Sequence, residues 1–287
     1  MTVDAHHHFW NPARYPQTWM TSAHAAIDRR FEASDLEPLL RASGVTATVL
    51  VQSAANDRDT DDLFEQIANV PWIGAVVGWL RLDDAEAARE RLGELQGRSR
   101  FRGVRHLINL EADPHWILRP SVTAGLELLE ENGVLLEVPA EFPNHLEDVP
   151  ELARRHPGLT IVIDHLGKPP LGLGGMSAWE EQLAEAAAYR NVHAKVSGLT
   201  TIGRMPSDPR PAIEAALDAF GPDRLMVGSD WPMSLLRDTY EGVVARMCLA
   251  IEEVAGSESR AILSGNALRL YRIEPAATSL PHETTIS

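Results

Sequence analysis

Cysteine, positive charge and long apolar runs are all scarce in this sequence. Cys248 is the only cysteine among 287 residues, which excludes an internal disulfide and fits a reducing compartment. No run approaches the roughly 18 consecutive apolar residues of a membrane helix. The N-terminus also lacks the basic and apolar segments of a secretory signal. We therefore expect a cytoplasmic protein that does not cross a membrane.

Basic residues number 26 against 41 acidic ones, for a formal net charge of −15. A surface of this sign repels phosphate groups, so nucleic acid is not an expected partner. The hydrophobic share of 44% is close to that of an ordinary globular protein, and the composition leaves a homo-oligomer open. We therefore expect the binding partner to be a small-molecule substrate.

What the sequence does contain is a regular alternation of short apolar runs with longer amphipathic stretches. The apolar runs, rich in valine and isoleucine as buried parallel strands are, cover residues 2–6, 45–52, 72–80, 101–108, 134–140, 160–166, 192–198 and 224–230. Helical patterns cover residues 35–43, 59–69, 83–96, 119–132, 145–156, 177–189, 210–219 and 238–255. Eight strand–helix units over 1–274 predict a single α/β domain, a (β/α)8 TIM barrel, followed by a C-terminal tail at 275–287. An open doubly wound sheet is the alternative, but no GxGxxG follows the first run.

The first apolar run leads into VDAHHHFW at residues 3–10, which contains three consecutive histidines. A purification tag usually has about six histidines and a linker, so this run belongs to the protein. Residues two apart on a strand share a face, so His6 and His8 point together while His7 points away. This H-x-H spacing is typical of metal ligands, although alone it suits structural histidines equally well.

Polar residues also gather at the ends of the other predicted strands. They are Gln52, Arg105, His106, Asp164, His165, Lys195, Ser197, Ser229 and Asp230. The C-terminal ends of the strands of a (β/α)8 barrel form one rim, where active sites lie. A charge inside an apolar strand is costly unless it is paired or used. His165 and Asp230 therefore join His6 and His8 in a predicted active site.

Several longer motifs frame these residues: VDAHHHFW, VLVQ, WIGAVVGWL, FRGVRH, VIDHLGKP, NVHAKVSGL, FGPDRLMVGSDWP and SGNALRLY. They span most of the chain, and DHLGKP followed by GSDWP is a specific pair. In these motifs the chain resembles the amidohydrolase superfamily, and within it the lactonase group that contains L-fuconolactonases and L-rhamnonolactonases. The resemblance implies a hydrolase that opens the ring of a sugar-acid (aldono-) lactone by attack of an activated water.

Three departures from these sugar lactonases bear on the substrate. Residues 108–111 read INLE where LQDE is frequent, and residues 200–202 read TTI where TEA is frequent. Glu137 stands where aspartate is common. The loops after these strands surround the barrel mouth, so the departures leave the particular lactone open.

The resemblance, together with position, assigns Asp230 as the general base. His6, His8 and His165 have two possible roles. They hold one divalent metal, zinc in first place, together with Asp230, or they donate hydrogen bonds to the substrate carbonyl without a metal.

Further residues are expected to contact the substrate. Arg105 and His106 are candidates for binding its oxygen-rich part, unless Arg105 pairs with Glu137 on the neighbouring strand. Lys195 orients Asp230, contacts substrate, or neutralises a carboxylate inside the barrel. Trp116 and Trp231, with Trp10 and Trp79, either wall the sugar face or belong to the core.

Three other functions stay open at this point. A lactonase of aromatic degradation, acting on pyrone dicarboxylate or muconolactones, belongs to the same group, but a dicarboxylate needs several arginines to bind it. A decarboxylase of the superfamily would share the three histidines and Asp230. A non-enzymatic sugar-binding protein would have no use for a carboxylate aligned with these histidines.

Overall fold

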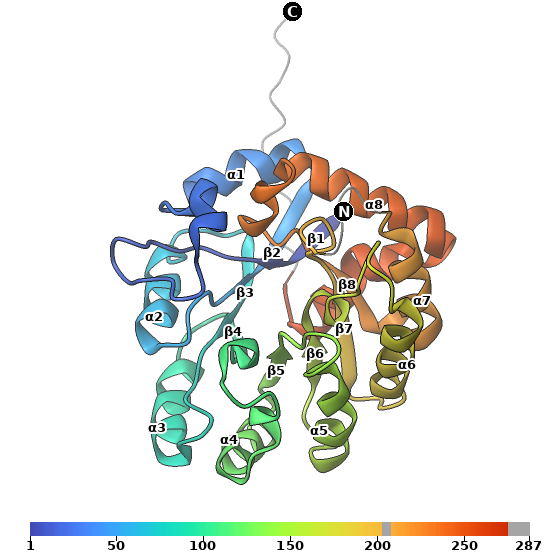
Figure 1. The fold of residues 1–287 in the computed structure, drawn as a ribbon. Helices are drawn as coiled ribbons and strands as arrows, with labels where there is room; N and C mark the ends of the chain where they lie inside the picture. The colour runs from blue at the N-terminus through green and yellow to red at the C-terminus, as the bar shows by residue number, and fades with distance from the viewer. Residues whose placement is uncertain (203–207, 275–287) are drawn as a thin grey trace, which may run out of the picture.

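Eight parallel strands close into a barrel in the computed structural model, which describes residues 1–202 and 208–274 (Figure 1). The strands are β1 Thr2–His7, β2 Val45–Val51, β3 Ile73–Gly78, β4 Phe101–Arg105, β5 Leu135–Val138, β6 Ile161–Ile163, β7 Val192–Val196 and β8 Leu225–Val227. Each strand pairs with the next in the sequence, and a bridge from His7 to Trp231 joins the first edge to the last. The predicted (β/α)8 fold is confirmed. The predicted tail, 275–287, lies outside the described residues.

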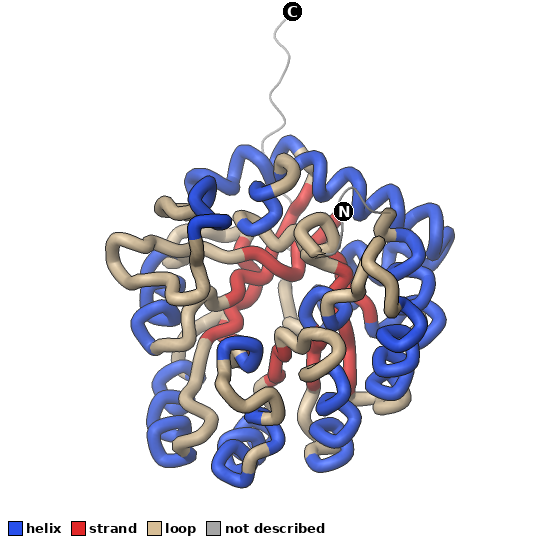
Figure 2. The backbone as a smooth tube through the Cα atoms, in the orientation of Figure 1, coloured by secondary structure: helices blue, strands red, loops and turns tan. Residues whose placement is uncertain are grey.

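A helix follows each strand and covers the outside of the barrel (Figure 2). The helices are α1 Ala33–Ala42, α2 Asp57–Gln66, α3 Ala85–Gln96, α4 Pro120–Glu131, α5 Val149–Arg155, α6 Met176–Ala187, α7 Arg210–Phe220 and α8 Tyr240–Ala255. A short helix, α9 Asn266–Leu270, follows α8 in the sequence. The fifth helix begins at Val149 rather than at residue 145, because Pro150 is tolerated only in the first turn. In the described part of the chain, no helix has the length and apolar character needed to span a membrane.

All strands except β1 end earlier than the apolar pattern predicts, and β4, β6 and β8 end three residues earlier. The chain leaves the sheet after Arg105 in β4, after Ile163 in β6 and after Val227 in β8. His165 and Asp230, predicted as strand ends, have φ angles of 55° and 57°, a left-handed conformation that a strand does not contain. These polar residues therefore lie in the first turns beyond the strands, on the C-terminal rim.

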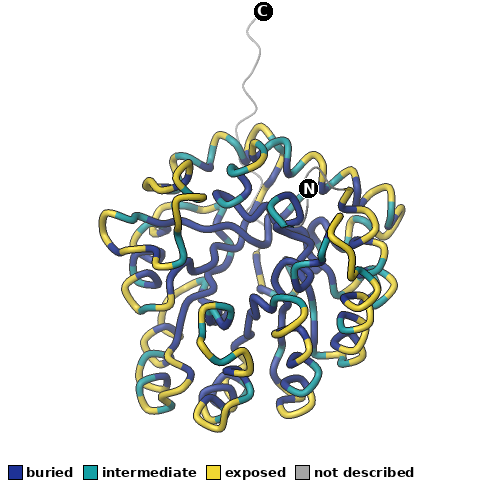
Figure 3. Tube along the Cα trace, viewed as in Figure 1, coloured by how far each residue is buried: buried dark blue, intermediate teal, exposed yellow. Residues whose placement is uncertain are grey.

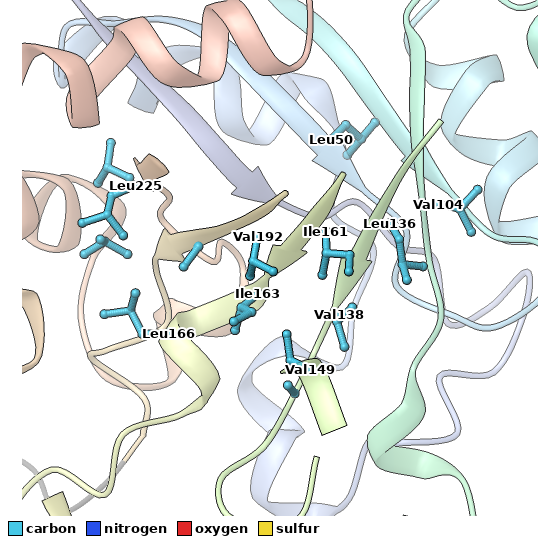
Figure 4. Packing of buried hydrophobic residues seen from close by; sticks show 14 of the residues in the cluster. Leu50, Val104, Leu136, Val138, Val149, Ile161, Ile163, Leu166, Val192 and Leu225 are labelled. Atoms are coloured by element: carbon cyan, nitrogen blue, oxygen red, sulfur yellow. The ribbon is translucent and has the colours of Figure 1, made fainter. Parts of the chain in front are cut away.

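Two apolar layers hold the barrel together, because successive strand residues point to opposite faces. The outer layer, between sheet and helices, includes Leu136, Val138, Ile161, Ile163 and Val192 (Figure 4). The inner layer fills the barrel with Val3, Ala5, Val49, Val77, Val162 and Met226. Tyr271 and Ile273, beyond α9, join this inner layer. The strands are buried as a result, and the exposed surface belongs mainly to helices and loops (Figure 3).

Candidate active site

Four side chains predicted as catalytic meet on the C-terminal rim. His6 and His8 come from the end of β1, His165 follows β6 and Asp230 follows β8. The Nε2 atoms of His6 and His8 are 3.1 Å apart. Asp230 Oδ1 lies 3.6 Å from His8 Nε2 and 3.8 Å from His6 Nε2. The rings of His6 and His165 are 4.6 Å apart. All four side chains are buried, and His165, at 8%, is the most exposed of the three histidines.

The buried carboxylate of Asp4 ties β1 to the turn that carries Asp230. Its Oδ1 accepts hydrogen bonds from the backbone N–H groups of Ser229, at 2.8 Å, and His6, at 3.2 Å. Its Oδ2 accepts from the Ser229 hydroxyl at 2.6 Å and from the Tyr240 hydroxyl at 3.1 Å. Burial raises the pKa of Asp4, while these hydrogen bonds favour the ionised form. Sequence analysis missed this residue, although an acid inside an apolar strand is a signal for such a role.

Two glycines make room for the catalytic side chains. A Cβ on Gly228, just after β8, would lie 2.6 Å from the Cβ of His6. Gly198, just after β7, has a φ of 65°, and a Cβ there would lie 2.7 Å from His165 Nδ1 and 3.2 Å from Asp230 Oδ2. Any side chain at either position would displace an imidazole. The glycines of the SGL and GSD motifs are therefore part of how the site is built.

His165 and Asp230 have surroundings that suit proton transfer. The Ser197 hydroxyl lies 2.9 Å from His165 Nδ1 and fixes the orientation of the ring. Burial lowers the pKa of His165, opposed by the negative charge of Asp230. Burial raises the pKa of Asp230, while the charges of His165, Arg105 and Lys168 lower it. Burial thus favours the neutral form of His165 and lets Asp230 bind a proton more readily than an exposed aspartate does.

Lys195 of β7 is fully buried inside the barrel. Its Nζ lies 2.6 Å from Glu137 Oε2 and 3.1 Å from His6 Nδ1. Tyr271 donates to the other oxygen of Glu137 at 2.5 Å. Of the three roles predicted for Lys195, its geometry supports the neutralisation of a barrel carboxylate. An exposure of 0% leaves no surface of Lys195 for a substrate.

Arg105 is also held by the protein itself. Its Nη1 lies 3.1 Å from Asp164 Oδ2, and its Nη2 donates to the Gln52 carbonyl. The alternative in which Arg105 pairs with Glu137 is wrong, although the two are register partners on β4 and β5. Glu137 is already neutralised by Lys195 of β7, so Asp164 is the acid left for Arg105.

His106 lies between two tryptophans beside the rim. Its ring stacks on Trp116 with centroids 3.9 Å apart, and Trp79 Nε1 donates to His106 Nδ1 at 3.2 Å. Because an indole N–H can only donate, neutral His106 carries its hydrogen on Nε2, which is 2.7 Å from Glu111 Oε1. Both ring nitrogens of His106 are therefore engaged in hydrogen bonds. The polar group of this cluster that faces solvent is the carboxylate of Glu111, whose side chain is 34% exposed.

Trp231 is packed in the core. Its side chain is 0% exposed and meets Phe9 and Phe31 edge-on, with ring centroids 6.1 and 5.1 Å away. This geometry favours the core alternative over the predicted contact with a sugar ring. Trp116 is 2% exposed and supports His106, so it too acts through a neighbour.

Comparison with known families matches residues 3–273 to the amidohydrolase family. The chain belongs to this family. Two curated relatives are L-fucono-1,5-lactonases. The one from Burkholderia ambifaria is 37% identical over 95% of this chain and 96% of that protein, and the one from Burkholderia multivorans is 34% identical over 98% and 99%. A crystal structure of an amidohydrolase from Burkholderia multivorans with bound zinc superposes with a TM-score of 0.88 at 33% identity, covering 96% of this chain and 100% of that one.

The amidohydrolase rim contains one cluster whose donors fit a divalent metal. Ligand atoms of His6, His165 and Asp230 lie within 4.8 Å of one another, and His8 adjoins them. Imidazole nitrogens with one carboxylate are typical zinc ligands, provided that each ligating nitrogen carries no hydrogen. The residue types and their closeness therefore fit one zinc ion.

A second group of close donors in this amidohydrolase does not fit a metal. His6, Glu137 and Asp164 also offer ligand atoms within 4.8 Å of one another. The Lys195 ammonium already lies 2.6 Å from Glu137 and 3.5 Å from Asp164, so these carboxylates have their cation. A metal there would place two positive charges side by side in a buried space.

Proposed function

We propose that this amidohydrolase hydrolyses the lactone of a sugar acid to the free aldonic acid, with Asp230 as general base. The observation that carries the proposal is the position of Asp230 Oδ1 within 3.8 Å of the Nε2 atoms of both His6 and His8 on one barrel rim. The two curated L-fucono-1,5-lactonases, similar over nearly the whole chain, support the choice of a lactone as substrate.

In the proposed reaction, Asp230 accepts a proton from a water molecule as the water oxygen bonds to the lactone carbonyl carbon. The carbonyl oxygen becomes an oxyanion, which N–H donors of the imidazoles stabilise. His165, the most exposed of the three rings, is the first candidate donor. The bond between the carbonyl carbon and the ring oxygen then breaks. Protonated Asp230 returns its proton to the leaving oxygen, and the product is an open-chain hydroxy acid.

One divalent ion fits the same side chains. His6, His165 and Asp230 would hold it, and bound zinc would supply a Lewis acid for the carbonyl oxygen and a bound water of lower pKa. The zinc in the structure of the Burkholderia multivorans amidohydrolase supports this assignment. The alternative without metal requires only that imidazole N–H groups face the carbonyl oxygen.

The rim favours a neutral, hydroxyl-rich substrate over a dicarboxylate. Arg105 is buried and occupied by Asp164 and the Gln52 carbonyl, so it has no free pair of donors for a substrate carboxylate. Glu111, 34% exposed, adds negative charge at the loop after β4, whereas Glu141 after β5 is paired with Lys168. Carboxylates accept hydrogen bonds from sugar hydroxyls and repel a second carboxylate.

A single assay distinguishes lactone hydrolysis from two rival functions. A decarboxylase of the superfamily releases CO₂, and a sugar-binding protein releases nothing, whereas lactone hydrolysis at neutral pH releases one acid equivalent for each ring opened. Aldonolactones should be screened with a pH indicator, with spontaneous hydrolysis in buffer subtracted. Release of acid far above the spontaneous rate is expected. No acceleration with any aldonolactone, pyrone or muconolactone would end the lactonase assignment.

We also propose a cytoplasmic location, supported by the single cysteine, Cys248. The acidic net charge of −15 supports a protein without a nucleic-acid partner. A homo-oligomer is the remaining prediction about partners, and light scattering of the purified chain tests it.

A further inference from the structure

Four consecutive residues after β6, 165–168, have a left-handed backbone. Their φ angles are 55°, 52°, 70° and 55°. Three of the four carry a Cβ, for which this conformation is unfavourable, and it persists only where contacts hold it. Here Trp179 Nε1 donates to the Leu166 carbonyl at 2.8 Å, and the Phe142 N–H donates to the Gly167 carbonyl at 2.9 Å. The fold therefore maintains an unfavourable turn at the proposed active site, where such backbone often has a function.

This turn places the side chains of His165 and Lys168 on one side. The Lys168 N–H donates to the His165 carbonyl at 2.9 Å, which closes a turn of about three residues, and side chains three apart eclipse in such a turn. The charge of Lys168 also acts on the catalytic pair. Burial lowers the pKa of His165 and Lys168 lowers it further, whereas burial raises the pKa of Asp230 and Lys168 opposes that rise.

Lys168, unlike Arg105 and Lys195, is accessible to a substrate. Arg105 and Lys195 are 5% and 0% exposed and already paired with buried carboxylates, whereas Lys168 is 34% exposed. The Lys168 ammonium has three N–H donors, and among the described residues it makes one hydrogen bond, to Glu141 Oε1. Asn109 donates to the same oxygen at 3.1 Å, so Glu141 is held by both neighbours. Two donors of Lys168 therefore remain for a ligand.

We propose that Lys168 is a catalytic residue whose ammonium group donates a hydrogen bond to the lactone carbonyl oxygen as negative charge forms there. The neutral lactone attracts a cation weakly, whereas the oxyanion attracts it strongly, so the interaction strengthens in the transition state. The ammonium keeps its proton, and its hydrogen bond passes to the product carboxylate when the bond from the carbonyl carbon to the ring oxygen breaks. A compact charge on a flexible stem, which lysine provides and arginine does not, suits a single oxygen atom. This role rests on the proposed lactone hydrolysis.

Lys168→Met and Glu141→Gln form a matched pair of variants, because both remove the same ion pair but only the first removes the ammonium group. In Lys168→Met, kcat should fall about 10²-fold, the size expected for loss of one oxyanion donor, with little change in KM. In Glu141→Gln, kcat should stay close to that of the unmodified protein. Lys168→Arg keeps the charge and should have a higher kcat than Lys168→Met. Circular dichroism checks that all three variants fold.

Product inhibition gives a readout that a purely structural role would not change. The aldonate released from the best lactone of the screen is compared with the alditol of the same sugar, which has a hydroxyl in place of the carboxylate. In Lys168→Met, the inhibition constant of the aldonate should rise about 10- to 100-fold, the size of a hydrogen bond to a charged group. The inhibition constant of the alditol should not change.

Acetylation tests the same contact in the unmodified protein. Only two of the 26 basic residues are lysines, Lys168 and Lys195, and Lys195 is fully buried. The amine reagent N-hydroxysuccinimidyl acetate should therefore modify Lys168 and the N-terminal amine. Mass spectrometry of the peptides should show that the aldonate slows acetylation of Lys168 but not of the N-terminus, and that the alditol protects Lys168 less.

The inference is wrong if Lys168→Met and Glu141→Gln lose kcat to the same extent, or if the aldonate binds Lys168→Met as tightly as it binds the unmodified protein. In either case a protein that hydrolyses lactones keeps the proposed function and loses only the role of Lys168. Failure of the proposed function has a different signature, because the unmodified protein would then hydrolyse no lactone, and the inference would fail with it.

Discussion

The hydroxyl of Ser229 donates a 2.6 Å hydrogen bond to Asp4, and so the first strand of the barrel holds the residue directly before Asp230. Asp230 itself has a φ of 57°. This conformation costs a non-glycine residue energy, and it persists because contacts with neighbouring residues hold it. Asp4 lies at the opposite end of the sequence and yet fixes the backbone from which the proposed base projects.

Asp4→Asn should therefore cause a large loss of kcat and only a moderate loss in the free energy of unfolding. The amide replaces one acceptor oxygen with a donor, which costs on the order of 1–3 kcal/mol of stability and loosens Ser229 and Asp230. We expect kcat to fall at least tenfold. The matched control is Asp59→Asn, since Asp59 is also fully buried and accepts hydrogen bonds from Ser53 at 2.8 and 3.0 Å. A similar loss of kcat in both variants at equal melting temperature would show that Asp4 has no special role.

Asp230→Asn should abolish turnover and leave the fold intact, because an amide cannot accept the proton of the attacking water. General bases contribute about 10²–10⁴-fold, so the loss in kcat should fall in that range. Circular dichroism and lactone hydrolysis would be measured on the same preparation. Retention of more than about a tenth of the rate would remove Asp230 from the role of base.

The pH profile should report the ionisation of Asp230. Burial raises its pKa above the ordinary aspartate value of 3.8, and the base works only when ionised. In chelator-treated protein, kcat/KM should therefore be full at neutral pH and decline as the pH falls through that raised pKa. The decline should begin at a higher pH than an exposed aspartate would give. A rate that stays level down to pH 4 would contradict this assignment.

The fold and the catalytic cluster could be predicted because their signals are local. Apolar runs of a strand's length alternate with amphipathic stretches, and the barrel rule places all strand ends on one rim. His6, His8, His165 and Asp230 were predicted together for this reason, and the structure brings them together.

The pairing of buried charges could not be predicted in the same way. Arg105 and Glu137 are adjacent in register, and the sequence made them plausible partners, but Glu137 of β5 pairs with Lys195 of β7, past the intervening strand β6. Such choices depend on which side chains of alternate strands share a layer inside the barrel. The burial of Trp231 against Phe9 and Phe31 depends on the closure between the first and last strands, and the sequence pattern does not contain it.

Metal content is expected not to exceed one divalent ion per chain at the rim. His6, His165 and Asp230 form one possible site, and the ammonium of Lys195 fills the other cluster that His6 adjoins. Elemental analysis of purified protein, followed by chelation and re-addition of zinc, would measure both content and dependence. Two equivalents per chain, both needed for activity, would contradict this view.

The substrate should be a small five- or six-membered lactone of a deoxy or L-configured sugar acid. Arg105 is occupied by Asp164, and Glu111 is held at the rim by the His106 N–H at 2.7 Å, so hydroxyl groups are favoured over carboxylates. The values of kcat/KM for L-fucono-, L-rhamnono-, L-galactono- and D-arabinono-lactone would be compared with those for pyrone dicarboxylate and muconolactone. Glu111→Gln removes the charge at the rim but keeps the size of the side chain. It should reduce the ratio of kcat/KM for the aldonolactones to kcat/KM for the aromatic-pathway lactones. A higher kcat/KM for the dicarboxylate than for every aldonolactone would leave a lactonase, but one whose substrate comes from aromatic degradation.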